Sequence, residues 1–291
     1  FAPDDTHPGG WGTILVVGFR LGGGEIALDL DGDAADDFTS RSAYVVLDIT
    51  DPESPPKLLA EITDPNLGFT TGLPALVKGR MANLTTGAYD AAADAWYLAF
   101  GSGPAGTSAA TRRVALADGV SHQSARLYLF NLTTLQFEDM DGATDGLQPA
   151  LDTGVLNSFV GDLTAVDWDR NYQDDALYFG LVEGLAPASP SGSLNRLRFS
   201  MDTSGSAPVL TLAATPISTM LDPDRPFQGA PVAYFDLAAN RQWVMAGTGR
   251  YLTAADNAGS YTNRFYGLME PLGSDGAFSN AAIDQTKLAN T

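Results

Sequence analysis

The sequence predicts an all-β protein, and three observations carry that prediction. The apolar segments are short, strand-sized runs rich in Val, Leu, Tyr and Phe, such as Ile14–Val17, and clusters of Gly, Pro, Asp and Ser separate them. Long amphipathic helical patterns are missing. A hydrophobic content of 44% over 291 residues is enough for a sizeable core, in one large all-β domain or two smaller ones.

The expected strands follow one another at short intervals along the chain. In order, the segments expected to form strands are Thr13–Phe19, Tyr44–Ile49, Lys57–Ile62, Leu73–Lys78, Trp96–Phe100, Arg126–Asn131, Leu135–Glu138, Leu163–Trp168, Ala176–Gly180, Leu194–Met201, Val209–Ala214, Ala230–Asp236, Gln242–Gly247 and Arg264–Met269. Turn-forming residues bound each of them.

These strands fall into a four-part repeat. It consists of a strand led by Pro or Gly, a strand ending in Phe-Gly or Ala-Gly, a strand ending in Asx or Asp-Thr, and a polar closing strand. LPALV, WYLAFGSG, RLYLFNLTT and LQFED form one copy, and LTAVDWD, ALYFG, LNRLRFSMDTS and VLTLAAT form another. Self-similar four-strand units are typical of β-propeller blades. A pair of two-sheet sandwiches is the alternative, but it would not explain the recurring glycine.

The repeat divides the chain into about four blades. We expect a single β-propeller domain or its C-terminal portion, with blades at roughly 9–65, 70–140, 160–215 and 228–272 and a tail at 273–291. The first blade lacks its opening strand, and propellers close with about four to eight blades. We therefore expect the chain to be part of a larger propeller.

The segment DWDRNYQDD spaces its oxygen-bearing side chains as a calcium loop does. Calcium takes about six to eight oxygen ligands, and a tight loop supplies them from alternate positions. Positions 1, 3, 5 and 9 hold side-chain oxygens and position 7 would offer its backbone carbonyl, which gives Asp167, Asp169, Asn171, Gln173 and Asp175. Apolar strands flank the loop, so this main site is expected between two strands.

A second segment repeats this spacing. Its expected ligands are Asp29, Asp31, Asp33 and Asp37, with Ala35 at the backbone position. Gly32 eases the bend. The alternative for both segments is that an acidic chain places Asp in its turns, where Asp bonds its own backbone. Turn chemistry explains one or two such residues but not a full ladder, so we expect two calcium sites of a structural or moderately tight kind.

Charge and cysteine content exclude several classes. The net charge of −19, from 35 acidic and 16 basic residues, argues against a nucleic-acid partner and an anionic membrane surface. No run approaches the ~20 apolar residues of a membrane span. With no cysteine, there is no disulfide framework, thiol nucleophile or thiolate metal site. The chain begins at Phe1 without a signal peptide, which we interpret as a processed or cropped product.

The other chemical motifs in the sequence give weaker evidence for a functional site. Gly101-Ser-Gly-Pro-Ala-Gly106 matches GxGxxG, but Pro104 and the all-β surroundings favour a flexible interstrand loop over a dinucleotide site. His7 and His122 have no second ligand at metal spacing, so we expect solvated loop histidines. No catalytic residue is assigned.

Four stretches together resemble the C-terminal propeller of the PilY family of type IV pilus biogenesis and tip proteins. They are GGWGTILVVGFRLGGG, SAYVVLDITDPESPPKLLAEITDPNLGFTTGLPALVKG, DWDRNYQDDALYFG, and RQWVMAGTGRYLTAADN with NRFYGLME. The resemblance runs from about Gly9 to Glu270. It implies a modified, quinoprotein-like β-propeller that is exported through the periplasm to the bacterial surface, where it is not an enzyme.

The resemblance also implies partners and a metal. Pilins or minor pilins would be partners, a host or surface receptor would be bound in adhesion, and calcium in the Asp167–Asp175 loop would regulate pilus extension and retraction. Asn171 departs from the commoner Asp at position 5, which removes one negative charge. The Asp29 ladder falls in a segment that varies in such proteins.

Two other functional classes remain open. Some propellers are quinone-dependent (PQQ-type) oxidoreductases, which use calcium to hold their cofactor, but many add a vicinal disulfide that this chain lacks. A carbohydrate-binding surface module would use tryptophans that stack on sugars. Trp11, Trp96, Trp168 and Trp243 all lie in or beside expected strands, so core packing is the simpler interpretation for most of them. Trp168 is expected to point away from the ion and pack beneath the loop.

Overall fold

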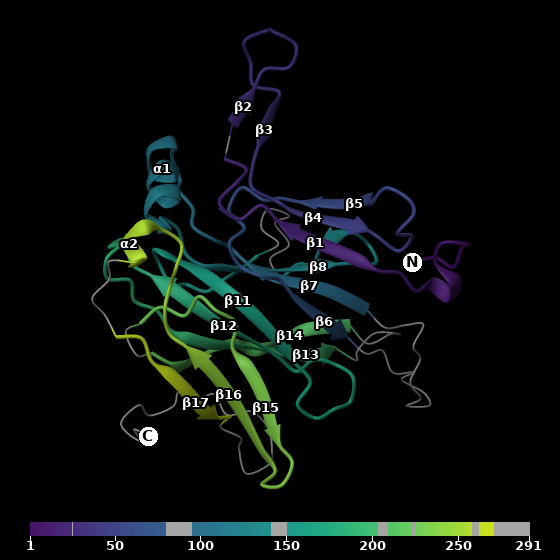
Figure 1. Ribbon diagram of the computed structural model, residues 1–291, viewed down its shortest axis with the longest axis vertical. Helices are drawn as coiled ribbons and strands as arrows, with labels where there is room; N and C mark the ends of the chain where they lie inside the picture. The colour runs from purple at the N-terminus through teal and green to yellow at the C-terminus, as the bar shows by residue number, and fades with distance from the viewer. Residues whose placement is uncertain are drawn as a thin grey trace.

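The computed structural model describes residues 1–24, 26–79, 95–140, 150–202, 209–222, 225–257 and 262–270. The tail expected at 273–291 lies outside these residues. The strands form four successive antiparallel sheets and one separate hairpin (Figure 1). None of the described sheets closes on itself. No helix in this part of the chain is long and apolar enough to cross a membrane.

The first two sheets contain the N-terminal half of the chain. The first has the order β1-β4-β5, from β1 (Ile14–Gly18), β4 (Tyr44–Asp48) and β5 (Lys57–Ile62). The second has the order β10-β8-β7-β6, and β9 also pairs with β8. Its strands are β6 (Ala75–Gly79), β7 (Ala95–Gly101), β8 (Arg126–Asn131), β9 (Gln136–Phe137) and β10 (Leu151–Asp152).

The third and fourth sheets contain the C-terminal half. The third has the order β11-β12-β13-β14, from β11 (Ser158–Val166), β12 (Ala176–Glu183), β13 (Leu194–Asp202) and β14 (Val209–Leu221). The fourth has the order β15-β16-β17, from β15 (Val232–Asp236), β16 (Arg241–Gly247) and β17 (Phe265–Met269). Every pair of named strands is antiparallel and joins strands close in sequence, as in propeller blades, and an isolated parallel bridge links Phe227 and Gly249.

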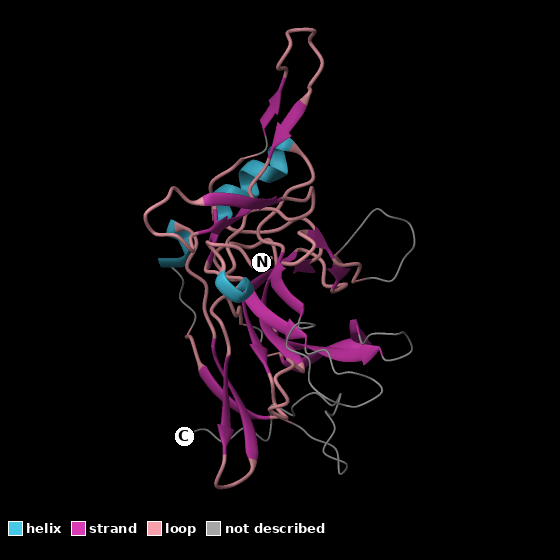
Figure 2. Cartoon of the chain, turned by 90° about the vertical axis from the view of Figure 1, so that its right-hand side faces the viewer, coloured by secondary structure: helices cyan, strands magenta, loops and turns pink. Residues whose placement is uncertain are grey.

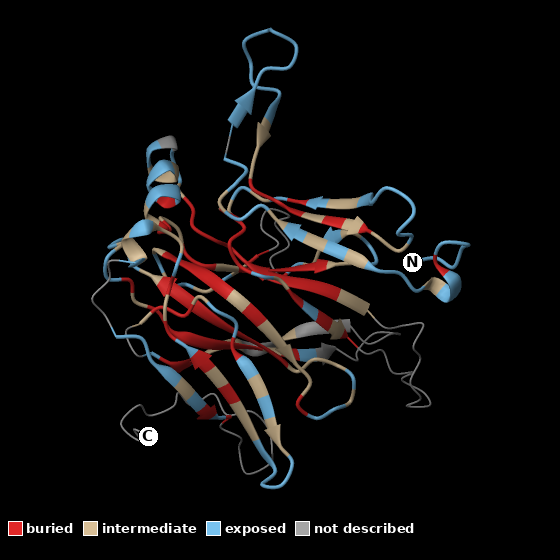
Figure 3. Ribbon diagram, viewed as in Figure 1, coloured by how far each residue is buried: buried red, intermediate tan, exposed pale blue. Residues whose placement is uncertain are grey.

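Alternating side chains build one apolar core between each pair of neighbouring sheets. Phe100 and Tyr128 face the first sheet, Phe179 and Leu177 face the second, and Tyr178 faces the fourth. Successive residues of a strand point to opposite faces, so the middle sheets are covered on both sides. Figure 3 shows this as buried residues through β7, β11 and β12, with more exposed strands at both ends of the series.

The hairpin of β2 (Ile26–Leu28) and β3 (Phe38–Ser40) projects from one end of the molecule (Figures 1 and 2). The sequence analysis did not expect these two strands. Their apolar side chains are exposed, with Ile26 at 58% and Phe38 at 51%, so these strands lack the alternation of buried and exposed residues that a half-buried strand shows.

Helix α1 (Ala109–Asp118) corrects the expectation for the glycine-rich loop. Ser108 and Thr111 form a capping box at its start, and Gly119 ends it with a left-handed φ of 60°. The preceding residues 101–105 are buried rather than flexible. A Cβ on Gly103 would lie 1.7 Å from the Phe69 carbonyl oxygen, so close backbone packing explains this glycine without a phosphate.

Two expected strands are longer in the structure. β11 begins at Ser158 rather than Leu163, because a bulge between Val160 and Leu163 carries the strand through Gly161 and Asp162, which resemble a turn in sequence. β14 continues past Ala214 to Leu221, and its pairing with β13 also shifts register.

His7 is buried, not solvated. Its ring nitrogens lie 2.8 Å from Asp4 Oδ1 and 2.9 Å from Asp48 Oδ2, and Phe1 stacks on the ring. His122 is also partly buried. Trp168 is 6% exposed and packs as expected, whereas Trp11 is 76% exposed, so core packing is the wrong interpretation for Trp11.

Candidate metal centre

The main acidic loop connects the first two strands of the third sheet, β11 and β12. β11 ends at Val166 and β12 begins at Ala176, so residues 167–175 form the connection. Asp175 N–H donates to the Val166 carbonyl at 2.8 Å, which fixes the base of the loop, and Trp168 is buried beneath it. The flanking strands are buried, so the loop stands on a rigid base.

Three carboxylates of this loop converge. Oxygens of Asp167, Asp169 and Asp175 all lie within 4.8 Å of one another. Backbone groups hold them in place: Trp168 N–H donates to Asp175 Oδ2 at 2.7 Å, and Tyr172 N–H donates to Asp167 Oδ2 at 2.7 Å. The loop therefore presents an oxygen-only ligand set.

The second acidic loop, between β2 and β3, has the same internal hydrogen bonds. The backbone N–H of Ala34, at position 6, donates to Oδ2 of Asp29, at position 1, at 2.8 Å. The backbone N–H of Leu30, at position 2, donates to Oδ2 of Asp37, at position 9, at 2.8 Å. Two loops with different sequences thus fold alike.

The exposed cluster in the second loop consists of Asp29, Asp31 and Asp37. Asp33, which the sequence analysis placed among the ligands, lies outside this three-carboxylate cluster and accepts a 2.8 Å hydrogen bond from Ala35 N–H, as Asn171 accepts one from Gln173 N–H in the main loop. The backbone N–H groups of Gly32 and Ala34 lower the pKa of Asp29. This loop is more solvated than the main one.

Both loops turn through left-handed backbone at positions 4 and 6. The φ angles are 61° at Arg170 and 71° at Tyr172 in the main loop, and 83° at Gly32 and 69° at Ala34 in the second. Calcium loops require a sharp turn at position 6, where glycine is usual. Tyr172 and Ala34 adopt a conformation that L residues visit at a cost.

Electrostatics in the main loop favour a cation. Burial raises the pKa of Asp175 to about 6, and the charges of Asp169 and Asp167 add to this effect. Burial also raises the pKa of Asp174 to about 6, although Lys78 N–H donates to its Oδ2 at 2.7 Å. Like charges held together and partly desolvated are stabilised by a positive ion.

The donor set fits a hard cation such as calcium, with one adjustment. Asn171 now turns its amide nitrogen toward Asp169 Oδ2 at 2.9 Å, while its Oδ1 accepts from Gln173 N–H at 2.7 Å. As a ligand, Asn171 would have to present Oδ1 to the ion. Gln173 has its position 7 carbonyl available for the role expected from sequence.

A buried polar network links the main loop to the fourth sheet. Trp168 Nε1 donates to Tyr178 Oη at 2.8 Å, Tyr178 Oη donates to Glu270 Oε2, and Arg196 Nη1 donates to Glu270 Oε1. Arg196 and Glu270 side chains are 1% and 0% exposed. The sequence analysis missed this network, because its members lie far apart in the chain and only the tryptophan stood out.

Comparisons with known proteins place the fold. No family model matches the chain, and no curated protein matches it. The solved structures include a similar one, the crystal structure of the Pseudomonas aeruginosa PilY1 C-terminal domain, with a TM-score of 0.56 and 18% identity. The match covers 96% of this chain and 49% of that one, so the chain spans about half of its length. At this identity the likeness concerns the fold, and it confirms the propeller class and the resemblance predicted from the sequence: the chain has the all-β, propeller-like fold of the PilY1 C-terminal domain.

Proposed function

We propose that the chain is a calcium-binding, non-catalytic protein of the bacterial cell surface that acts with type IV pili. The observation that carries the proposal is the convergence of Asp167, Asp169 and Asp175 in a loop anchored between two buried strands. The fold it shares with the PilY1 C-terminal domain, together with the family resemblance of the sequence, supports the pilus context.

The proposed mechanism is electrostatic. Without an ion, the three carboxylates repel one another and the loop loosens. With calcium bound, the loop becomes rigid and its outer face presents one shape to a pilin, a minor pilin or a surface receptor. The exposed ring of Tyr172, 68% accessible and 5.8 Å from the Lys78 ammonium, lies on this outer part of the loop. In this role calcium would support pilus extension and adhesion.

The second loop is proposed as a second calcium site. Its hydrogen bonds match those of the main loop at equivalent positions, which supports the same kind of ligand. Its carboxylates are exposed, so water competes for the ion more strongly, and we expect weaker binding than at the main site.

Calorimetric titration of calcium tests both sites. The wild type is expected to show two binding events, and Asp175→Asn should remove the tighter one while Asp37→Asn removes the weaker one. Asp36→Asn is the matched control, because it makes the same charge change beside Asp37 but lies outside the three-carboxylate cluster. Calcium binding that is unchanged in Asp175→Asn would contradict the main site.

The pilus role is tested separately in the source bacterium. A strain that carries Asp175→Asn is expected to export the protein to the cell surface but to lose pilus-dependent surface motility and adhesion. The Asp36→Asn strain serves as control. Wild-type motility in the Asp175→Asn strain, with calcium binding lost in the purified variant, would reject the regulatory role while keeping the metal site.

A further inference from the structure

Three strand glycines, Gly18, Gly101 and Gly180, are in close contact with the segment that leads into the next sheet. A Cβ added to Gly101, at the end of β7, would lie 2.1 Å from Val160 Cβ. A Cβ added to Gly180, in β12, would lie 2.1 Å from the Phe227 carbonyl oxygen. Gly18, at the end of β1, similarly lies against the Thr70 carbonyl oxygen, at 3.1 Å from an added Cβ. Only glycine leaves room for these approaches.

The segments that fill the positions at Gly101 and Gly180 share one geometry. Val160 N–H donates to the Ser102 carbonyl at 2.9 Å, and Phe227 N–H donates to the Leu181 carbonyl at 3.1 Å. In each case the acceptor is the residue directly after the glycine. The segment that leads into the next sheet therefore places a bulky apolar residue on the glycine and bonds the following carbonyl.

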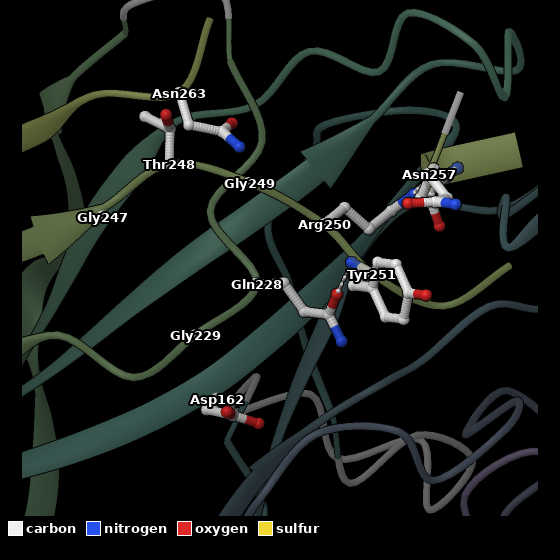
Figure 4. A pocket seen from close by; sticks show the side chains of 11 residues that line it. Asp162, Gln228, Gly229, Gly247, Thr248, Gly249, Arg250, Tyr251, Asn257 and Asn263 are labelled. Carbon is white, nitrogen blue, oxygen red and sulfur yellow. Dashed lines mark hydrogen bonds and ion pairs between the residues drawn. The ribbon is translucent and has the colours of Figure 1, made fainter. Parts of the chain in front are cut away.

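Gly247, at the end of β16, is the fourth member of this series and is open. Among the described residues, its added Cβ would meet only Phe265 Cδ2, at 3.8 Å. A cavity of about 560 Å³ lies at this glycine, lined by Asp162, Gln228, Gly229, Gly247, Thr248, Gly249 and Tyr251 among others (Figure 4). Thr248 is the residue that corresponds to Ser102 and Leu181.

The cavity also lies where a chain of contacts between inner segments ends. Leu73 N–H donates to Asp162 Oδ1 at 2.7 Å, and Asp162 N–H donates to the Gln228 carbonyl at 2.8 Å. These bonds connect the segments that lead into the second, third and fourth sheets. Gln228 and Gly229 form the last step and border the cavity.

Two charged residues that line the cavity, Arg250 and Asp256, pair with each other. Arg250 is buried, and its Nε and Nη2 lie 2.8 Å and 2.6 Å from Asp256 Oδ1 while Nη1 donates to the Gly119 carbonyl at 2.6 Å. Its charge is therefore neutralised within the protein. Gln228 Oε1 accepts from Tyr251 N–H at 2.8 Å, so its amide is fixed at the cavity wall (Figure 4).

The outer face of the fourth sheet continues from this cavity as an exposed apolar surface. The side chains that form it are Val232, Tyr234, Phe265 and Met269, which are 60%, 53%, 74% and 51% exposed. The corresponding face of the third sheet, with Ala176 and Tyr178, is covered by the fourth sheet. Exposed apolar patches on sheets mark interaction surfaces.

We infer that the cavity at Gly247 is the docking site for the inner segment of a further propeller blade. The segment would be an extended peptide that places a bulky apolar residue on Gly247, donates its N–H to the Thr248 carbonyl and pairs beside Gln228 and Gly229. The rest of that blade would cover the apolar face of β15–β17. This inference is independent of calcium and agrees with the expectation that the four sheets belong to a larger propeller.

A peptide made from the chain's own repeat is a suitable probe. The synthetic segment 225–236, RPFQGAPVAYFD, already occupies the equivalent position at Gly180. Because the chain has no cysteine, Asn263→Cys introduces a single thiol at the cavity wall for an environment-sensitive dye. The peptide is expected to change the dye fluorescence in a saturable way. A peptide with Asp in place of Phe227 should bind at least tenfold more weakly.

Gly247→Val in the labelled protein is the decisive variant. A Cβ at this position would lie 3.8 Å from Phe265 Cδ2, which is ordinary contact, so the thermal midpoint should stay close to that of the wild type while peptide affinity falls at least tenfold. Gly24→Val is the matched control, since Gly24 also has open space around it but lies elsewhere. No saturable change with the wild type, or equal affinity in Gly247→Val, would overturn the inference. So would a dimer in sedimentation that Gly247→Val dissociates, because the occupant would then be a second copy.

Discussion

Replacing Glu270 by leucine tests how the main acidic loop, residues 167–175, is coupled to the rest of the fold. Glu270 accepts hydrogen bonds from Arg196 and Tyr178, and both members of the ion pair are almost fully buried. Glu270→Leu removes the carboxylate that accepts from Arg196 Nη1 and Tyr178 Oη, and so takes one negative charge away from the buried Arg196 guanidinium. Removing one partner of a buried ion pair costs about 3–5 kcal/mol, because the other charge stays buried and loses that attraction.

The assay is equilibrium and thermal unfolding of the purified chain without calcium. A loss of this size should lower the thermal midpoint by on the order of 10 °C. The calcium affinity is expected to fall as well, because Trp168, the second residue of the main acidic loop, donates a hydrogen bond to Tyr178 Oη. Glu270→Gln, which keeps a hydrogen-bond acceptor, should show a smaller loss.

The double variant Arg196→Met with Glu270→Leu is the control for shape. It removes both charges, so stability should return to within about 1–2 kcal/mol of the wild type. If Glu270→Leu loses less than about 1 kcal/mol, or if the double variant is no more stable than the single one, then burial of an unpaired charge is not what governs this site.

Three further predictions follow from particular contacts. The pKa values of Asp174 and Asp175 are raised from 3.8 to about 6, so between these pH values the folded state holds protons that the unfolded state has released. Without calcium, the free energy of unfolding should therefore fall as the pH rises from about 4 to 6. Saturating calcium should reduce this slope, and an unchanged slope in unfolding titrations would contradict the prediction. Gly180→Ala should destabilise by about 2 kcal/mol or more, because its Cβ meets Phe227 backbone, whereas Gly247→Ala should stay within about 0.5 kcal/mol; equal unfolding midpoints would reject the packing argument. His7→Ala should make the first twelve residues cleavable in limited proteolysis, since the ring bridges Asp4 and Asp48, and unchanged protection would show that other contacts hold this segment.

The sequence by itself predicted most strands, the propeller class and the spacing that brings three carboxylates together in each acidic loop. These features are local. Strand pairing between neighbours in sequence depends on alternation and turn residues, and the positions of Asp167, Asp169 and Asp175 follow from the spacing within nine residues. The resemblance to the PilY family rested on the same short motifs, and the shared fold bears it out.

Local signals also failed in recognisable ways. The bulge at Gly161 and Asp162 resembles a turn, so β11 was expected to start too late. Helix α1 is only ten residues long and weakly amphipathic, and its capping box was overlooked because the surrounding pattern was all-β. Histidine spacing also gave no sign that His7 is buried between Asp4 and Asp48.

Only the tertiary structure decided how distant residues meet. Tyr178 and Glu270 are 92 positions apart, and no local pattern relates them. Their hydrogen bond nevertheless links the main acidic loop, through Trp168, to the fourth sheet. The recurring glycine was visible in the sequence, but its meaning was not. Packing showed that Gly101 and Gly180 are each filled by the next sheet and that Gly247 is open, because steric exclusion depends on which segments lie side by side and not on their order in the chain.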